Sequence, residues 1–210
     1  WYFEVDSLIF RKTISGNEID TALYQVKEVV ADTFTNAANE LVFVIDKYER
    51  KSASENWSIR TVYAAFFSQN RFLKTEENNT FIKFPLPPIR GLRWDGTAMI
   101  NKTQLAEVGG ESIEVFKDWE SRIKLFNHTF NNGILDFSDC FTVEIADSES
   151  LIDLRSGFEV YSKNFGLIYR QLYVLDTQCD GNPANCKDKT WEEKAEKGFI
   201  VKQRLTAFQY

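Results

Sequence analysis

The chain has 210 residues, and 25 Lys and Arg against 31 Asp and Glu give a net charge of −6 at pH 7. Its length suits a substantial hydrophobic core, and its 43% hydrophobic and 27% charged residues fit neither a disordered polymer nor a membrane bundle. A single His and three Cys exclude most transition-metal sites and most nucleophile–histidine chemistry.

The distribution of charged and apolar residues excludes two further classes. Lys and Arg are scattered singly rather than gathered in a basic stripe, so we expect no nucleic-acid partner. No window of 18 apolar residues exists, so we expect no segment of the chain to span a bilayer.

Alternating apolar and polar residues, rich in β-branched and aromatic side chains, predict strands along most of the chain. Polar turns separate them, such as Ser15-Gly16-Asn17 and Asn132-Gly133. Roughly ten strands are expected, at residues 2–10, 24–30, 41–48, 57–67, 71–75, 80–84, 122–130, 135–145, 158–161, 167–175 and 199–208.

Four stretches depart from this pattern. Residues 101–110 are expected to form a loop, and residues 112–119 either a helical turn or two or an irregular edge strand. A short helical turn is expected near residues 148–155. Thr190 begins a capping-box sequence that predicts a helix of at most two turns, which Gly198 would stop.

These elements predict an all-β fold. Short polar turns leave no room for crossover helices, so the sheet should be antiparallel. We expect a single, strongly twisted sheet curled into a half-open barrel or a sandwich, with at most two short helices. No shift in composition marks a boundary, so residues 1–210 are expected to form one domain.

The three cysteines indicate a compartment. Cys179 and Cys186 bracket a Gly-Asn-Pro turn, which favours a disulfide worth about 2.5 kcal/mol over free thiols. A metal knuckle would need two more soft ligands, which the sequence lacks, so we expect no metal there. A disulfide would place the protein in an oxidising compartment. Cys140, flanked by apolar residues, is expected to be a buried free thiol.

Five segments lie in order along the chain: residues 24–35 (YQVKEVVADTFT), 44–50 (VIDKYER), 76–85 (EENNTFIKFP), 94–96 (WDG) and 159–170 (EVYSKNFGLIYR). Together they resemble a family of extracytoplasmic lipoproteins of unknown function from Bacteroidota. The resemblance implies a signal peptide and an acylated cysteine ahead of Trp1, and a β-domain tethered to the outer membrane. It implies no activity.

The large number of aromatic residues, 18 Phe, 8 Tyr and 5 Trp, is the one feature of the sequence that suggests a function. These rings either fill the sheet interior, line a site for an apolar ligand, or form a surface platform for a glycan or an envelope protein. The weak candidates for ligand contact are Trp57, Tyr63, Trp94, Tyr161 and Tyr169.

Other candidate sites are weaker. His128 has no nucleophile or acid placed by sequence to form a triad, and pairs such as Asp136 and Asp139 are typical of solvated turns. Oxygen ligands for Ca²⁺ are present around the cysteine loop, at Asp176, Asp180, Asn182, Asn185 and Asp188, but their spacing does not fit the twelve-residue calcium loop.

The leading hypothesis is therefore a non-enzymatic, lipid-anchored extracytoplasmic component in binding or envelope assembly, without a cofactor or catalytic residue. The first alternative is a carrier that holds an apolar ligand inside the barrel. A hydrolase is a further alternative, and it would need two carboxyl groups converging in a pocket.

Overall fold

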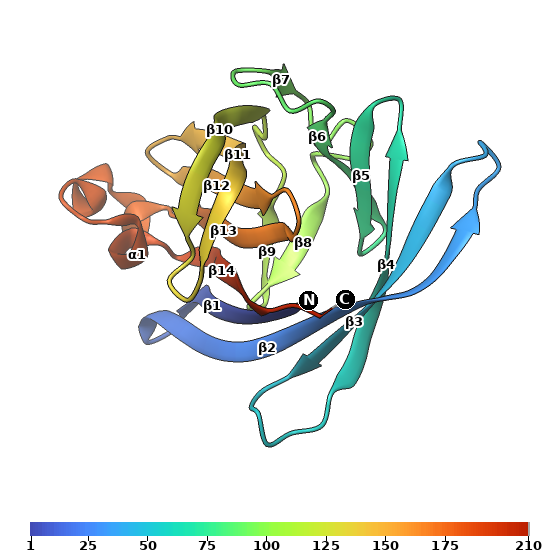
Figure 1. The fold of residues 1–210 in the computed structure, drawn as a ribbon. Helices are drawn as coiled ribbons and strands as arrows, with labels where there is room; N and C mark the ends of the chain where they lie inside the picture. Colours follow the sequence, from blue (N-terminus) through green and yellow to red (C-terminus); the bar gives the residue numbers. More distant parts are fainter. Residues whose placement is uncertain (210) are drawn as a thin grey trace.

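A computed structural model gives the structure of residues 1–209 (Figure 1). Within these residues, twelve strands form one antiparallel sheet in the order β6-β5-β4-β3-β2-β1-β14-β13-β12-β11-β10-β7, and β8 pairs with β9 in a separate hairpin. The strands are β1 (Tyr2–Thr13), β2 (Gly16–Thr35), β3 (Leu41–Arg50), β4 (Ser58–Ser68), β5 (Arg71–Glu76), β6 (Asn79–Pro85), β7 (Arg93–Trp94), β8 (Leu105–Val108), β9 (Glu111–Glu114), β10 (Ser121–Asn131), β11 (Asp136–Glu149), β12 (Asp153–Ser162), β13 (Gly166–Asp176) and β14 (Lys197–Ala207). The predicted all-β fold is confirmed.

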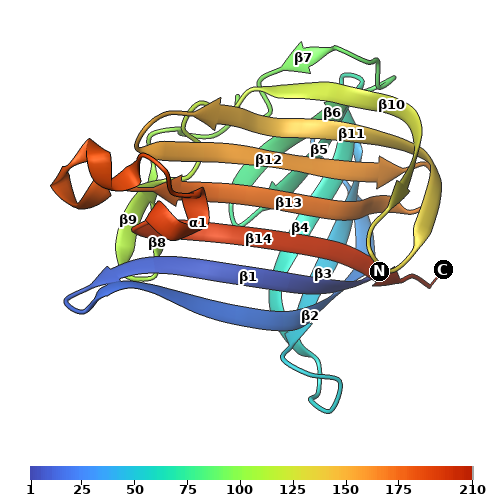
Figure 2. The same cartoon turned by 90° about the vertical axis from the view of Figure 1, so that its left-hand side faces the viewer.

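The sheet curls around itself without closing. Strands β10 to β14 run across the view in Figure 2, whereas β3 to β6 run steeply behind them, and β1 and β2 join the two halves. Strands β6 and β7 remain the two edges of the sheet. The result is the half-open barrel that the predicted twist allows, with the side chains of both halves facing a shared interior.

The β8–β9 hairpin and the residues after it fill one end of this barrel, opposite the end at which the two termini lie (Figure 2). Ile113, Phe116 and Trp119 are buried against the interior. Polar contacts fix the hairpin, because Arg155 Nε donates to the Glu114 carbonyl at 2.9 Å and Lys197 Nζ donates to the Ser112 carbonyl at 2.9 Å. We call residues 105–119 the end plug.

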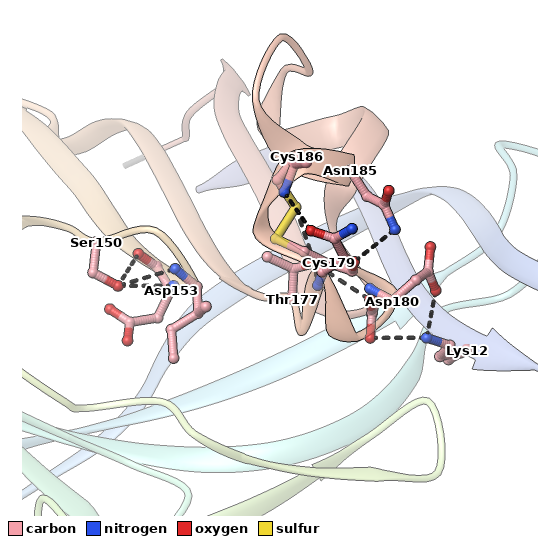
Figure 3. Close-up of a disulfide and its surroundings, with 12 residues drawn as sticks. Lys12, Ser150, Asp153, Thr177, Cys179, Asp180, Asn185 and Cys186 are labelled. Carbon is pink, nitrogen blue, oxygen red and sulfur yellow. Dashed lines mark hydrogen bonds and ion pairs between the residues drawn. A yellow bond between two sulfur atoms is a disulfide. The ribbon is translucent and has the colours of Figure 1, made fainter.

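Residues 179–194, which we call the disulfide segment, are attached to the outside of the barrel (Figure 1). Cys179 and Cys186 form the predicted disulfide (Figure 3), with a Cα–Cα distance of 5.5 Å, and Cys140 is a buried free thiol. Glu196 holds the segment in place, since its carboxylate accepts the backbone N–H of Asp180 at 2.9 Å. The segment contains 3-10 helices at Cys179–Gly181 and Pro183–Cys186, followed by helix α1 (Trp191–Lys194).

Three predictions of local structure are wrong. Residues 105–108 form β8 rather than loop, and residues 148–155 form the ends of β11 and β12 with a turn rather than a helical turn. Helix α1 has the predicted capping box at Thr190 but ends at Lys194. Gly198 lies instead inside β14, where its φ of +118° and the neighbouring β13 backbone leave no room for a side chain.

Alternation along residues 57–67 predicts one face of β4 formed by Trp57, Ile59, Thr61, Tyr63, Ala65 and Phe67, and this prediction is correct over only part of the strand. Tyr63 and Ala65 are buried, whereas Ile59 is 58% exposed. A bulge explains the difference, because Lys47 pairs with Thr61 while the next residue, Tyr48, pairs with Ile59. One extra residue in β4 turns the side chains before it to the opposite face.

None of the helices within residues 1–209 combines the length and the apolar character that crossing a membrane requires.

Candidate functional site

The barrel interior contains an apolar cavity of about 470 Å³. Aromatic rings from both halves of the sheet form much of its wall, and Phe84 contacts Tyr161 edge-on at 4.8 Å while Phe141 stacks on Tyr161 at 5.4 Å. We call it the apolar cavity, and it is lined by Trp1, Phe3, Glu28, Ile45, Phe67, Phe72, Lys74, Glu76, Lys83, Phe84, Leu86, Phe141, Tyr161, Ser162, Lys163, Phe165, Gly166 and Leu167.

The apolar cavity reaches solvent at the end of the barrel away from the end plug. Its exposed lining residues are Phe67 near the β4–β5 turn, and Lys163 and Gly166 at the β12–β13 turn. Trp1 narrows this opening, since its indole N–H donates to the Phe165 carbonyl at 2.7 Å. The chain termini lie at the same end of the barrel (Figure 2).

A second cavity, of about 240 Å³, lies on the side of the end plug and is lined in part by Phe116, Trp119 and Tyr63. More polar groups border this cavity, among them Asn79 and Gln203, and we call it the polar cavity. Glu28, Lys74, Glu76 and Leu167 line both cavities. Charged side chains therefore form most of the wall between the two spaces.

This wall belongs to a larger ionic network, composed of Glu28, Lys74, Glu76, Lys83, Glu159 and Arg170. Lys83 Nζ on β6 lies 3.0 Å from Glu159 Oε1 on β12 and 3.6 Å from Glu76 Oε1 on β5. Arg170 contacts both of these carboxylates, at 3.6 Å from Glu76 and 3.4 Å from Glu159. Lys74 bridges Glu28 and Glu76 at 3.2 and 3.3 Å.

The network is balanced, with three cations and three carboxylates, and it spans the barrel interior. It joins the β5–β6 pair to the β12–β13 pair, and no backbone hydrogen-bond ladder connects one pair to the other. Glu159 is completely buried, and its second oxygen accepts the Tyr161 hydroxyl at 2.6 Å. Because each buried charge has oppositely charged partners, removal of any one of them would leave the others without compensation in the interior.

The buried carboxylates are ionised. Burial opposes ionisation of Glu76, but Lys83, Lys74 and Arg170 outweigh it and hold its pKa well below the usual value. The pKa of Glu159 is lowered in the same way, with burial opposed by Lys83 and Arg170. Burial raises the pKa of Tyr63 to about 12 and that of Tyr161 well above its usual value, so both phenols are neutral.

This electrostatic arrangement is unsuited to carboxylate acid–base catalysis. Glu76 and Glu159 are the two carboxyl groups that converge in the interior, as the hydrolase alternative requires. A general acid, however, needs a raised pKa so that it carries a proton near neutral pH. The pKa values of Glu76 and Glu159 are both lowered instead, so neither carboxyl group meets this requirement.

The five aromatic candidates are not brought together. Tyr161 lines the apolar cavity, Tyr63 the polar cavity, and Trp94 a gap between the sheet edges. Trp57 and Tyr169 line none of these spaces. Trp57 lies near Tyr2 and beneath the Arg50 guanidinium, and Tyr169 stacks on Phe158 and donates to Gln171.

The other sequence candidates do not form a site. His128 contacts Thr142 Oγ1 and the Thr129 carbonyl. The oxygen ligands near the disulfide are used elsewhere, since Asp176 pairs with Arg155 and Asp180 with Lys12. Over residues 1–209, no group of three or more His, Cys, Asp or Glu side chains is placed to hold a metal ion.

Sequence reasoning missed the ionic network. Lys74 and Glu76 occupy alternate positions in a strand, and Glu159 and Tyr161 do so in another, so each pair shares one face. The inward face of a strand can be recognised in the sequence from its apolar residues, such as Phe81 in β6. A charged residue on such a face was the available signal for the network, although this signal does not indicate which strands meet.

No family model matches this chain, and neither the curated proteins nor the solved structures include a match to it. The resemblance to extracytoplasmic lipoproteins accordingly stays a prediction.

Proposed function

We propose that this chain is a non-enzymatic extracytoplasmic protein that binds one apolar or amphipathic small molecule inside its half-open barrel. The observation that carries the proposal is the apolar cavity, with a volume of about 470 Å³ and a wall rich in aromatic rings. Small-molecule sites in proteins typically have volumes of about 300–1,000 Å³ and apolar walls with a few placed polar groups.

The distribution of aromatic residues supports an interior site over a surface platform. Phe3, Phe72 and Phe84 line one space, where a ligand would contact rings from three strands of the sheet. In contrast, Trp57 on the outer side already packs against its own cationic neighbours, Lys27 and Arg50. Burial of apolar ligand surface at about 25 cal/mol per Å² supplies the affinity.

The disulfide supports the extracytoplasmic part of the proposal. Cys179 and Cys186 are bonded, and structural disulfides persist mainly in oxidising compartments. Attachment to the outer membrane through a lipid ahead of Trp1 rests on the resemblance alone. Binding in the apolar cavity does not depend on that anchor.

Titration with the neutral dye N-phenyl-1-naphthylamine, monitored by fluorescence, tests the proposal. We expect saturable binding of one dye per chain and a loss of at least about ten-fold in affinity for Leu86→Trp, which fills the apolar cavity. Leu41→Trp is the matched control, because Leu41 is 52% exposed and lines no cavity. Thermal unfolding of each variant checks that it folds. Non-saturable dye binding, or equal affinity in the two variants, would contradict the proposal.

A further inference from the structure

The apolar cavity has charged residues at two positions, and they differ in whether their charge is already paired. Glu28, Lys74, Glu76 and Lys83 lie at the wall shared with the ionic network or next to it. Lys163 lies at the exposed β12–β13 turn, at the opening. These two positions determine where the polar end of an amphipathic ligand can bind.

The inner position offers no free charge. Lys74 is bridged by Glu28 and Glu76, and Lys83 Nζ is 3.0 Å from Glu159. A charged ligand group placed there would lose its hydration and disturb a balanced set of buried ions. The inner part of the cavity is therefore suited to the apolar end of a ligand.

The opening offers an unpaired cation. Within residues 1–209, the Lys163 ammonium has neither a hydrogen bond nor an ion pair to another part of the chain, and it is the one charged side chain lining the cavity of which this is true. The neighbouring Ser162 hydroxyl is already used, since it donates to the Ser138 carbonyl at 3.0 Å. Lys163 can therefore turn toward a negative group at the opening without breaking an existing contact.

We infer that the ligand is a single-chain amphiphile with an anionic head, bound with its hydrocarbon chain in the apolar cavity and its head at the opening beside Lys163. This inference rests on the proposed function and specifies its ligand class. The ion pair at the opening is partly hydrated, so it supplies selectivity rather than most of the affinity. The hydrocarbon chain supplies the affinity, and each added methylene should tighten binding about four-fold until the cavity is full.

Displacement of N-phenyl-1-naphthylamine by three twelve-carbon competitors, dodecanoate, dodecanol and dodecylamine, tests the inference at pH 7.5 and low ionic strength. We expect dodecanoate to bind up to about five-fold more tightly than dodecanol, and dodecylamine to bind most weakly. Lys163→Gln should abolish the preference for dodecanoate over dodecanol, and Lys163→Glu should reverse it in favour of dodecylamine. Lys187→Gln, which changes an exposed lysine in the disulfide segment, is the matched control and should retain the wild-type preference.

The outcomes separate this inference from the proposed function. If dodecanol displaces the dye as well as dodecanoate does, or if the preference for dodecanoate survives Lys163→Gln, the anionic head at Lys163 is wrong while binding in the apolar cavity stands. If the dye itself does not bind saturably, the proposed function is wrong. Hexanoate and octanoate, whose chains are too short to fill a cavity of about 470 Å³, test the chain arm, since equal affinities for the two would show that the hydrocarbon is outside the cavity.

Discussion

At the scale of single residues, buried charge is the main departure from an ordinary β-sheet core. Lys83, Glu159 and Arg170 lie where apolar side chains usually pack, and each is matched by opposite charge within 4 Å. Replacing one member of such a set leaves its partners buried without compensation. The stability of this barrel should therefore be unusually sensitive to neutral substitutions in the network.

Glu159→Gln should lower the free energy of unfolding by about 3–5 kcal/mol, because it leaves Lys83 and Arg170 with a single shared carboxylate, Glu76. Denaturant unfolding measures the change. Glu18→Gln is the matched control at an exposed ion pair with Arg11, where we expect a change within about 0.5 kcal/mol.

A double variant distinguishes lost charge balance from lost packing. Lys83→Met combined with Glu159→Gln leaves two cations and two carboxylates, so it should be more stable than the sum of the single losses predicts. Strict additivity of the two substitutions would contradict the network as an electrostatic unit.

At the scale of elements, β14 illustrates how closely two strands approach. Gly198 pairs with Leu175 of β13, and a Cβ added at Gly198 would lie 2.0 Å from the Val174 carbonyl oxygen. The sequence pattern suggested that Gly198 stops a helix, because glycine is common both at helix ends and where two strands approach closely. The contact with the β13 backbone shows that Gly198 has the second role.

Gly198→Ala should therefore destabilise the protein much more than Gly16→Ala, although the two glycines have similar φ values of +118° and +123°. Gly16 lies in the β1–β2 turn, where a Cβ would meet no atom within 4 Å, so its substitution carries only backbone strain of about 1–3 kcal/mol. Thermal or denaturant unfolding measures both. Similar losses of unfolding free energy in the two variants would show that the close β13–β14 contact adds nothing to the cost of the substitution at Gly198.

The disulfide segment is the second element-scale test. Reduction should loosen the segment but leave the barrel folded, because the bond closes a short loop worth about 2.5 kcal/mol, and Glu196 and Lys12 still hold Asp180. A chromogenic thiol reagent should detect no thiol in the native protein and one, Cys140, after denaturation. Three thiols after denaturation would mean that Cys179 and Cys186 are reduced.

At the scale of the whole molecule, an open sheet is held in a barrel shape by contacts across its interior rather than by a closed ladder. The end plug fills one end, and the ionic network joins the two halves. The other end contains the apolar cavity. Because the network is ionic, the stability of the whole barrel should depend on pH.

The free energy of unfolding should be highest between about pH 5 and pH 9. The pKa values of Glu76 and Glu159 are lowered on folding, so their contribution is present above the unfolded value near 4.3 and is lost as the pH falls below it. The pKa of Tyr63 is raised to about 12, so its contribution is lost as the pH rises from 10 through 12. Denaturant unfolding across pH measures the profile, and Glu159→Gln should flatten its acid limb. A profile unchanged between pH 3 and pH 7 would contradict ionised buried carboxylates.

Much of the fold was predictable because its signals are local. Alternating side chains identified most strands from residues 2–10 onward, and short polar turns required antiparallel pairing. The strand count and β8 were missed because two-residue and four-residue strands contain too few alternations. The disulfide was predictable because Cys179 and Cys186 are seven residues apart across a turn.

The sequence by itself therefore determined the class of fold, the antiparallel pairing and the cysteine bridge, all of which depend on residues close together in the chain. Only the tertiary structure decided whether the interior is filled, and which charges meet there. Lys83 and Glu159 are 76 residues apart, and their contact depends on how far the twisted sheet curls before its edges approach. The apolar cavity depends on the same curvature, because the space left between two curved halves is set by the whole sheet rather than by any single strand.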